Sequence, residues 1–333
     1  MKKISLIFIL LIIGTAKMSE IHASTDTSEY KKPVYIVKIS YAGTGAEFRL
    51  NDIPIYLENF SGQVDVEIPV SDKMVQGINE LTIIAFPFVD EDAETDSYME
   101  DWEHNDARVE ATLYVREHDD LTIPQQLLTH IKLYPARPPE VAAIESVVIA
   151  GQELPIIDIL SQPRQFPGPI IYKQSVISRK THPIATPFPR WEWQDGITIE
   201  ESEENYKTLL EAYRKQYNIY EKKDLIALKQ SNRKLAETEM LVKYHLDIDR
   251  AYDMLNLEES WNSEEQELFE FIEGDLSESF GLKLEVVANG KLARIVDNEN
   301  TQPIVYVVKT ARMTIKYKFL FYKNKQGDWV YIM

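Results

Sequence analysis

The period of the hydrophobic pattern changes twice along this chain, and this limits the folds that it can adopt. In residues 34–117, apolar and polar residues alternate in short runs, as in 63–68 and 108–115. A period of two is typical of strands with one buried face. From Thr198 to Leu257 apolar residues recur at helical spacing, and strand-like runs return from Leu282. The sequence therefore predicts an α+β protein in which helices separate two sets of strands.

The first half carries strand signals with turns between them. Strand-like runs cover 34–39, 53–57, 63–68, 78–88 and 108–115, and Asn51-Asp52 is a turn signal between two of them. Short strands at such spacing favour an antiparallel β-sandwich. Residues 119–200 are rich in proline but keep strand-like pieces at 146–150 and 170–178, so we expect extra strands and a wrapped connection. We place this β-sandwich domain at 24–197.

The second half begins with helices. Thr198 and Glu201 are spaced as a capping box, and a helix follows whose apolar face carries Tyr206, Leu209, Leu210, Tyr213, Tyr217 and Tyr220. This tyrosine face predicts a helix that packs on a core, with a ligand pocket as the alternative. Further helices are expected at 224–245, at 248–257, and after Ser263. Strands are expected at 282–288, 292–297, 303–308, 313–322 and 329–332.

Two segments of this half resemble the NTF2-like superfamily, including its SnoaL-type members. The phrase LLEAYRKQYNIYEKKDLIAL (209–228) is similar to that family's opening helices, and YKFLFYKNKQGDWVYI (317–332) to its last strands. The resemblance covers 200–333, although 233–261 is a long insertion relative to the family. It implies a domain at 198–333, with helices backing a curved antiparallel sheet around a cone-shaped cavity. The first half resembles jelly-roll and Ig-like modules only in its general architecture.

The first 23 residues have the order of a secretory signal peptide. Lys2 and Lys3 precede an apolar run at 4–13, and small residues follow. We expect cleavage after Ala23, with Ala16 as an alternative site and a retained N-terminal anchor as the competing interpretation. No other stretch is long enough to span a membrane. The sequence thus predicts a periplasmic or secreted protein with no membrane partner after cleavage.

The chain is strongly acidic and contains no cysteine. Its net charge is -18, and removal of residues 1–23 would bring it near -20. Such a charge opposes binding to nucleic acid and favours a partner with a basic surface, or serves solubility alone. The absence of cysteine excludes thiol catalysis and cysteine metal sites.

A stretch without any lysine or arginine, residues 90–106, concentrates this charge between two predicted strands. Its predicted partner-binding residues are Asp90, Glu91, Asp92, Glu94, Asp96, Tyr98, Glu100, Asp101, Trp102 and Glu103. Three interpretations remain open. The stretch is a solvated loop, a docking surface for a basic protein with its aromatic residues as anchors, or a calcium site. It lacks the glycine-centred spacing of an EF-hand.

Trp191 and Trp193 stand in an aromatic cluster before the helices. They predict packing between the domains, with a sugar-stacking platform as the alternative, and we include both in the expected partner surface. No Gly-x-Ser-x-Gly motif, phosphate-binding glycine loop or paired histidine motif occurs. We therefore predict no catalytic residue, no metal site and no cofactor.

These observations favour a binding protein over an enzyme. The leading hypothesis is an exported protein that binds another protein, in one version an immunity or inhibitor protein that masks an exported toxin or enzyme. The alternative is a small-molecule or carbohydrate binder that uses the β-sandwich or the NTF2-like cavity. The sequence leaves the oligomeric state open.

Overall fold

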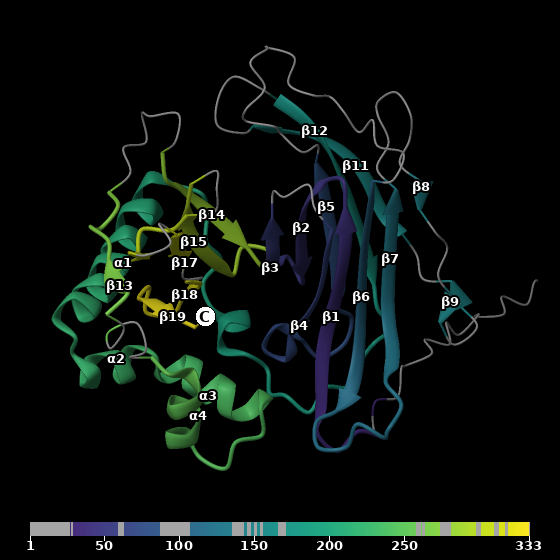
Figure 1. Ribbon diagram of the computed structural model, residues 1–333, viewed down its shortest axis with the longest axis horizontal. Helices are drawn as coiled ribbons and strands as arrows, with labels where there is room; N and C mark the ends of the chain where they lie inside the picture. Colours follow the sequence, from purple (N-terminus) through teal and green to yellow (C-terminus); the bar gives the residue numbers. More distant parts are fainter. Residues whose placement is uncertain are drawn as a thin grey trace, which may run out of the picture.

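The computed structural model describes most of the chain after its first segment. The described residues are 27, 29–58, 63–86, 107–134, 143–144, 148–149, 152–153, 156–165, 171–257, 261, 264–273, 281–297, 301–309, 313–316 and 319–332. Within them the fold is α+β with antiparallel sheets, as the change of period predicted (Figure 1).

The first sheet runs in the order β4-β1-β6-β7-β8. Its strands are β1 (Pro33–Ala42), β4 (Val64–Pro69), β6 (Arg108–Glu117), β7 (Gln126–Tyr134) and β8 (Ala143–Ile144). The sequence pattern identified β1, β4 and β6. It did not identify β7, which lies in the proline-rich stretch 119–200.

The second sheet runs in the order β11-β12-β5-β2-β3. Its strands are β2 (Gly45–Leu50), β3 (Ile53–Glu58), β5 (Glu80–Phe86), β11 (Ile156–Gln165) and β12 (Ile171–Lys180). The short strands β9 (Val148–Ile149) and β10 (Gln152–Glu153) pair separately. Strands from the proline-rich stretch thus join both large sheets.

The two large sheets face each other across one core (Figure 1). On β1, every second residue is completely or almost completely buried in this core, and Val37 and Ile39 show the pattern. Phe48 of β2 and Ile83 of β5 enter the same core from the other sheet. The alternation read in the sequence is therefore the alternation of core-facing side chains.

Two short 3-10 helices precede the α-helices. They are η1 (Ser71–Lys73), in the first half, and η2 (Glu192–Asp195), shortly before the first α-helix. The α-helices are α1 (Glu203–Lys222), α2 (Leu225–Ser231), α3 (Arg233–Val242) and α4 (Ile248–Leu255). Two predictions were wrong here. The N-cap of α1 is Ser202, whose Oγ accepts the Asn205 N–H at 3.2 Å, and not Thr198. The helix expected at 224–245 divides at Asn232, where α2 ends and α3 begins.

Strands of the second half form two further sheets. One contains β14 (Lys283–Val287), β15 (Leu292–Val296), β18 (Phe321–Lys323) and β19 (Trp329–Tyr331), and the other β13 (Gln266–Leu268), β16 (Val305–Val308) and β17 (Met313–Lys316). The helix expected after Ser263 was wrong, because β13 occupies that place and pairs with β16. The strand expected at 313–322 was also wrong in extent, because β17 and β18 belong to different sheets.

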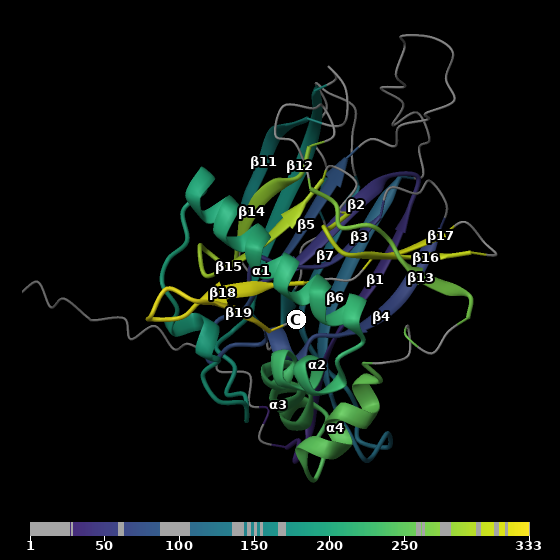
Figure 2. The ribbon, with the colours of Figure 1, turned by 90° about the vertical axis from the view of Figure 1, so that its left-hand side faces the viewer.

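Helix α1 packs against the sheet that contains β14 and β15, and α2, α3 and α4 lie below it in Figure 2. Its tyrosine face packs on a core, as predicted, and Tyr213 is fully buried there against Phe319 and Phe321. The Tyr213 hydroxyl donates to Gln302 Oε1 at 3.1 Å. Burial raises the pKa of this tyrosine well above its ordinary value. Among the described helices, none is long and apolar enough to cross a membrane.

Candidate functional site

The two halves of the chain meet at a seam that is part of the first core. Here the seam means the contact between the elements up to η2 and the elements from α1 onward. Val242 of α3, Leu292 of β15 and Tyr322 of β18 belong to the same buried cluster as the residues between the two large sheets. The halves are therefore joined by a continuous apolar core.

A cluster of ion pairs crosses the seam beside this core. The Arg49 guanidinium on β2 contacts Glu47 at 2.6 Å, Asp52 at 3.0 Å and Glu285 of β14 at 2.8 Å. Glu285 also pairs with Arg294 of β15, whose side chain is only 6% exposed. Burial alone would raise the pKa of Glu285, but the two arginines outweigh it and hold this pKa below its usual range. The paired charges thus compensate one another at a mostly buried position.

Two hairpin turns meet next to these ion pairs. Asn51 and Asp52 have φ of 54° and 62°, and Ala288 and Asn289 both have φ of 53°. At Asn51-Asp52 two consecutive positive φ angles form the two-residue turn that suits the twist of antiparallel strands, whereas the β14–β15 turn has four residues, 288–291, of which the first three have positive φ. The Asn289 N–H donates to Asp52 Oδ2 at 3.1 Å, and the Ala288 N–H donates to the Asp52 carbonyl at 3.3 Å. The β2–β3 and β14–β15 hairpins therefore hold each other at their tips.

Trp191 and Trp193 lie in the same seam. They are 6% and 8% exposed, and both belong to the shared core. The Trp191 ring stacks on Phe188 with centroids 5.8 Å apart, and its Nε1 donates to the Met74 carbonyl at 2.7 Å. A sugar-stacking platform needs a free aromatic face, so these burial values support the interpretation as packing between the halves.

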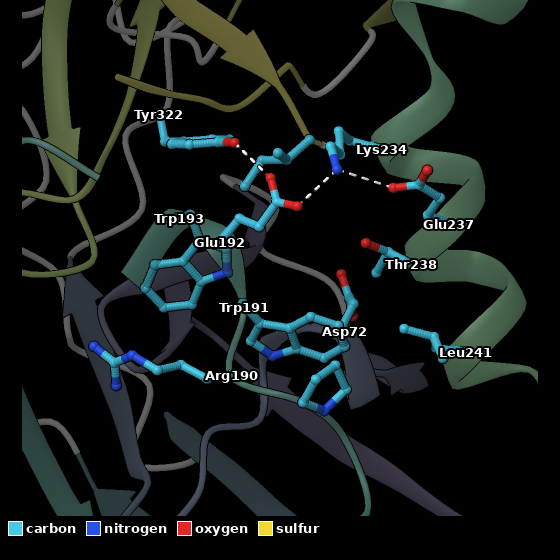
Figure 3. A pocket seen from close by; sticks show the side chains of 12 residues that line it. Asp72, Arg190, Trp191, Glu192, Trp193, Lys234, Glu237, Thr238, Leu241 and Tyr322 are labelled. Atoms are coloured by element: carbon cyan, nitrogen blue, oxygen red, sulfur yellow. Dashed lines mark hydrogen bonds and ion pairs between the residues drawn. The ribbon is translucent and has the colours of Figure 1, made fainter. Parts of the chain in front are cut away.

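A pocket opens beside the two tryptophans, with a volume of about 240 Å³. We call it the seam pocket (Figure 3). One wall comes from η1 and the segment around η2, and the opposite wall from α3 and β18. The pocket is lined by Asp72, Pro189, Arg190, Trp191, Glu192, Trp193, Lys234, Glu237, Thr238, Leu241, Tyr322 and Ile332.

A hydrogen-bonded group of charges holds the walls of the seam pocket together. Lys234 Nζ donates to Glu192 Oε1 at 2.7 Å and to Glu237 Oε2 at 3.0 Å, and the Tyr322 hydroxyl donates to Glu192 Oε2 at 2.9 Å (Figure 3). The Lys234 hydrogen bond lowers the pKa of Glu192 and the Glu192 hydrogen bond raises the pKa of Lys234. Burial, together with Glu192, raises the pKa of Tyr322 to about 12. Glu192 thus connects η2 to both α3 and β18.

The ten acidic and aromatic residues predicted to bind a partner, Asp90 to Glu103, lie outside the described residues. The sequence did not single out the residues that α3 contributes to the seam pocket, namely Lys234, Glu237, Thr238 and Leu241. No local signal relates them to Trp191, which lies more than forty positions earlier. Across the described ranges, no group of three or more histidine, aspartate or glutamate side chains is arranged to hold a metal ion.

Comparisons of this chain with protein-family models, curated proteins and solved structures found no match. Its function is therefore inferred from the chemistry of its own surfaces.

Proposed function

We propose that this chain is an exported binding protein whose seam pocket receives an apolar side chain from a basic protein partner. The observation that carries the proposal is the composition of the pocket. Trp191, Leu241 and Ile332 provide apolar walls, and carboxylates stand beside them. Side chains of binding partners that contribute most affinity typically enter small apolar pockets of this kind.

The size of the seam pocket favours a side chain over a free small molecule. Pockets for drug-sized ligands usually hold about 300–1,000 Å³. At about 240 Å³ the seam pocket is smaller, and one side chain of a partner would occupy it. The Glu192–Lys234–Tyr322 hydrogen bonds hold its walls in place before binding, which reduces the entropy cost of association.

Charge selects a basic partner. The pocket contains Asp72, Glu192 and Glu237 against Arg190 and Lys234, a net charge of -1. The whole chain carries -18, so attraction acts at long range as well as at the pocket. The occupant that fits is an apolar side chain flanked by lysine or arginine.

The pocket wall is open to a partner at Leu241, which is 39% exposed, whereas the exposed Leu246 does not line the pocket. We also propose that the acidic stretch 90–103 contributes to binding this partner, on the strength of its charge.

We further propose that the two facing sheets form a β-sandwich at 24–197, and that the helices and sheets that follow form an NTF2-like domain at 198–333. The signal peptide, the charge and the pocket together suit an immunity or inhibitor protein that masks an exported toxin or enzyme.

The test places a photocrosslinking amino acid at position 241 of the mature protein, with position 246 as the matched control. Crosslinked peptides from a periplasmic extract are identified by mass spectrometry. We expect position 241 to crosslink to one protein at a segment with an apolar residue next to lysine or arginine. Leu241→Asp should then weaken affinity for that protein by at least about 30-fold, the loss expected for a central contact. Equal crosslinking from both positions, or unchanged affinity of the folded variant, would refute the proposal.

A further inference from the structure

The strands β3 and β4 are the end strands of the two large sheets, one in each sheet (Figure 1). An end strand has one row of backbone N–H and C=O groups that no neighbouring strand uses. On β3 the core-facing residues Ile53 and Ile55 are at most 5% exposed, and next to them the Asp52 carbonyl accepts the Ala288 N–H. The second half of the chain thus contacts the tip of the β2–β3 hairpin, and the core beside β3 is closed.

The core beside β4 is open to solvent. Val64, Val66 and Ile68 pack against the same core, but they are only partly buried. Their neighbours on β1 differ, because Val37, opposite Ile68, and Ile39, opposite Val66, are fully buried. Among the described strands, β4 pairs with β1 alone. Solvent therefore reaches the apolar side of β4 from its free edge.

The register of β4 on β1 shows which backbone groups lie at this free edge. Tyr35 and Val70 continue the register, and there the Val70 N–H donates to the Tyr35 carbonyl at 2.9 Å. Along an antiparallel strand, residues that bond to the neighbouring strand alternate with residues whose N–H and C=O point away from it. The backbone groups of Asp65 and Glu67 therefore point outward. Pro69 has no N–H, so it ends this row of donors.

The same two residues place carboxylates on the outer face of the sheet, and both are exposed. Lys38 of β1 stands opposite Glu67 and lies 3.6 Å from an oxygen of Asp65. In this ion pair the side chains are 47% and 56% exposed, so it contributes little to stability. One cation thus serves two carboxylates, and negative charge remains at the edge of β4.

We propose that the free edge of β4 accepts an extended strand of another protein in which apolar residues alternate with lysine or arginine. The backbone of this strand would bond to Asp65 and Glu67, and its basic side chains would face their carboxylates. Its apolar side chains would cover Val64, Val66 and Ile68. In such strand addition, main-chain hydrogen bonds provide affinity and alternate side chains provide specificity.

A second copy of this chain does not fit the edge. Antiparallel pairing of β4 with β4 about Val66 would place Asp65 of each copy opposite Glu67 of the other, and like charges directly opposite destabilise a sheet. The inference goes beyond the function proposed above, because no residue of β4 lines the seam pocket. It holds whether or not that pocket receives a side chain.

The first experiment follows amide hydrogen exchange in the mature protein at single-residue resolution. Without a ligand, the Asp65 and Glu67 amides should exchange faster than the Val66 amide, which bonds to β1. A synthetic peptide that alternates valine with lysine should then slow the Asp65 and Glu67 amides by at least about tenfold at saturation. Protection of both amides before the peptide is added, or no slowing after it, would overturn the proposal.

A second peptide, which alternates valine with glutamate, tests the role of charge. The lysine peptide should bind at least about tenfold more tightly, since two cross-strand charge pairs change from repulsion to attraction. Glu67→Lys should reduce this preference severalfold. Asp253→Lys on α4 makes the same change in net charge at another exposed position and should leave the preference nearly unchanged. Equal effects of the two substitutions would show general attraction to an acidic protein and would refute the site.

A third pair of variants tests the backbone bond and guards against loss of folding. Asp65→Asn and Asp65→Pro both remove the charge, but only proline removes the outward N–H, and proline is tolerated on edge strands. Both variants are checked by circular dichroism. The lysine peptide should bind Asp65→Pro severalfold more weakly than Asp65→Asn. Equal affinity of the two folded variants would contradict pairing at this edge.

Discussion

Glu285 offers the sharpest test of how the two halves are joined. It stands on β14 and pairs across the seam with Arg49 of β2, and within its own sheet with Arg294. Replacing Glu285 with glutamine keeps the shape of the side chain and removes its charge. Arg49 keeps Glu47 and Asp52, but no other ion pair is described for Arg294, whose side chain is 6% exposed.

The size of the effect follows from this asymmetry. Breaking a buried ion pair by removing one partner costs about 3–5 kcal/mol, because a buried charge is left uncompensated. Glu285 is 21% exposed, so water partly solvates the site and we expect the low end, about 3 kcal/mol. Glu203→Gln is the matched control, because it breaks a pair with Lys207 in which both side chains are 69% exposed. Such exposed pairs contribute little to stability, because water screens both charges.

Urea unfolding followed by far-ultraviolet circular dichroism measures both variants. A double-mutant cycle with Arg294→Met isolates the interaction energy of the Glu285–Arg294 pair from the other effects of each substitution. The double variant should recover much of the stability lost in Glu285→Gln, because both charges are then absent. A loss for Glu285→Gln no larger than that for Glu203→Gln would refute the idea that these ion pairs stabilise the seam.

Three further predictions follow from the same region. The pKa of Glu285 is lowered in the folded state, so its contribution to stability is complete above its ordinary pKa of about 4.3 and is lost as the pH falls through the folded value. Between pH 6 and pH 3, the free energy of unfolding in urea should therefore fall less for Glu285→Gln than for wild type. Trp191→Phe removes the donor to the Met74 carbonyl and should cost about 1–3 kcal/mol in the same assay, and an unchanged midpoint would contradict the hydrogen bond. Gly196→Ala would bring a Cβ to 2.7 Å from the Lys323 carbonyl, so the segment must shift; we expect a loss of about 1–3 kcal/mol, and wild-type stability would contradict this close approach.

Much of the fold could be predicted because it depends on local pattern. The alternation in 63–68 and 108–115 identified β4 and β6, and the helical spacing of Tyr206, Tyr213 and Tyr220 identified α1 and its buried face. Local pattern was insufficient where pairing decides the structure. The run after Ser263 has helical spacing, yet residues 266–268 form a strand because β16 offers it an edge.

The candidate site was predictable only in part. Trp191 and Trp193 were identified because an aromatic cluster before a change of period suggests packing between domains. Their partners across the pocket, Lys234 and Glu237, carry no such signal, since lysine and glutamate on a helix most often face water. The tyrosine face of α1 was predicted to pack on a core, with a ligand pocket as the alternative, and Tyr206, Tyr213 and Tyr220 are buried in that core.

The sequence by itself determined the class of the protein. Its two hydrophobic periods specify an α+β chain, and its composition specifies a strongly acidic chain without cysteine, because these properties depend on residue type and spacing alone. The tertiary structure decided where pockets form. They lie where distant segments of the chain come together: Trp191 and Leu241 line one pocket at the seam, and Tyr217 and Trp261 line another at the end of α1. Such meetings depend on long-range packing between elements, for which no single segment carries the information.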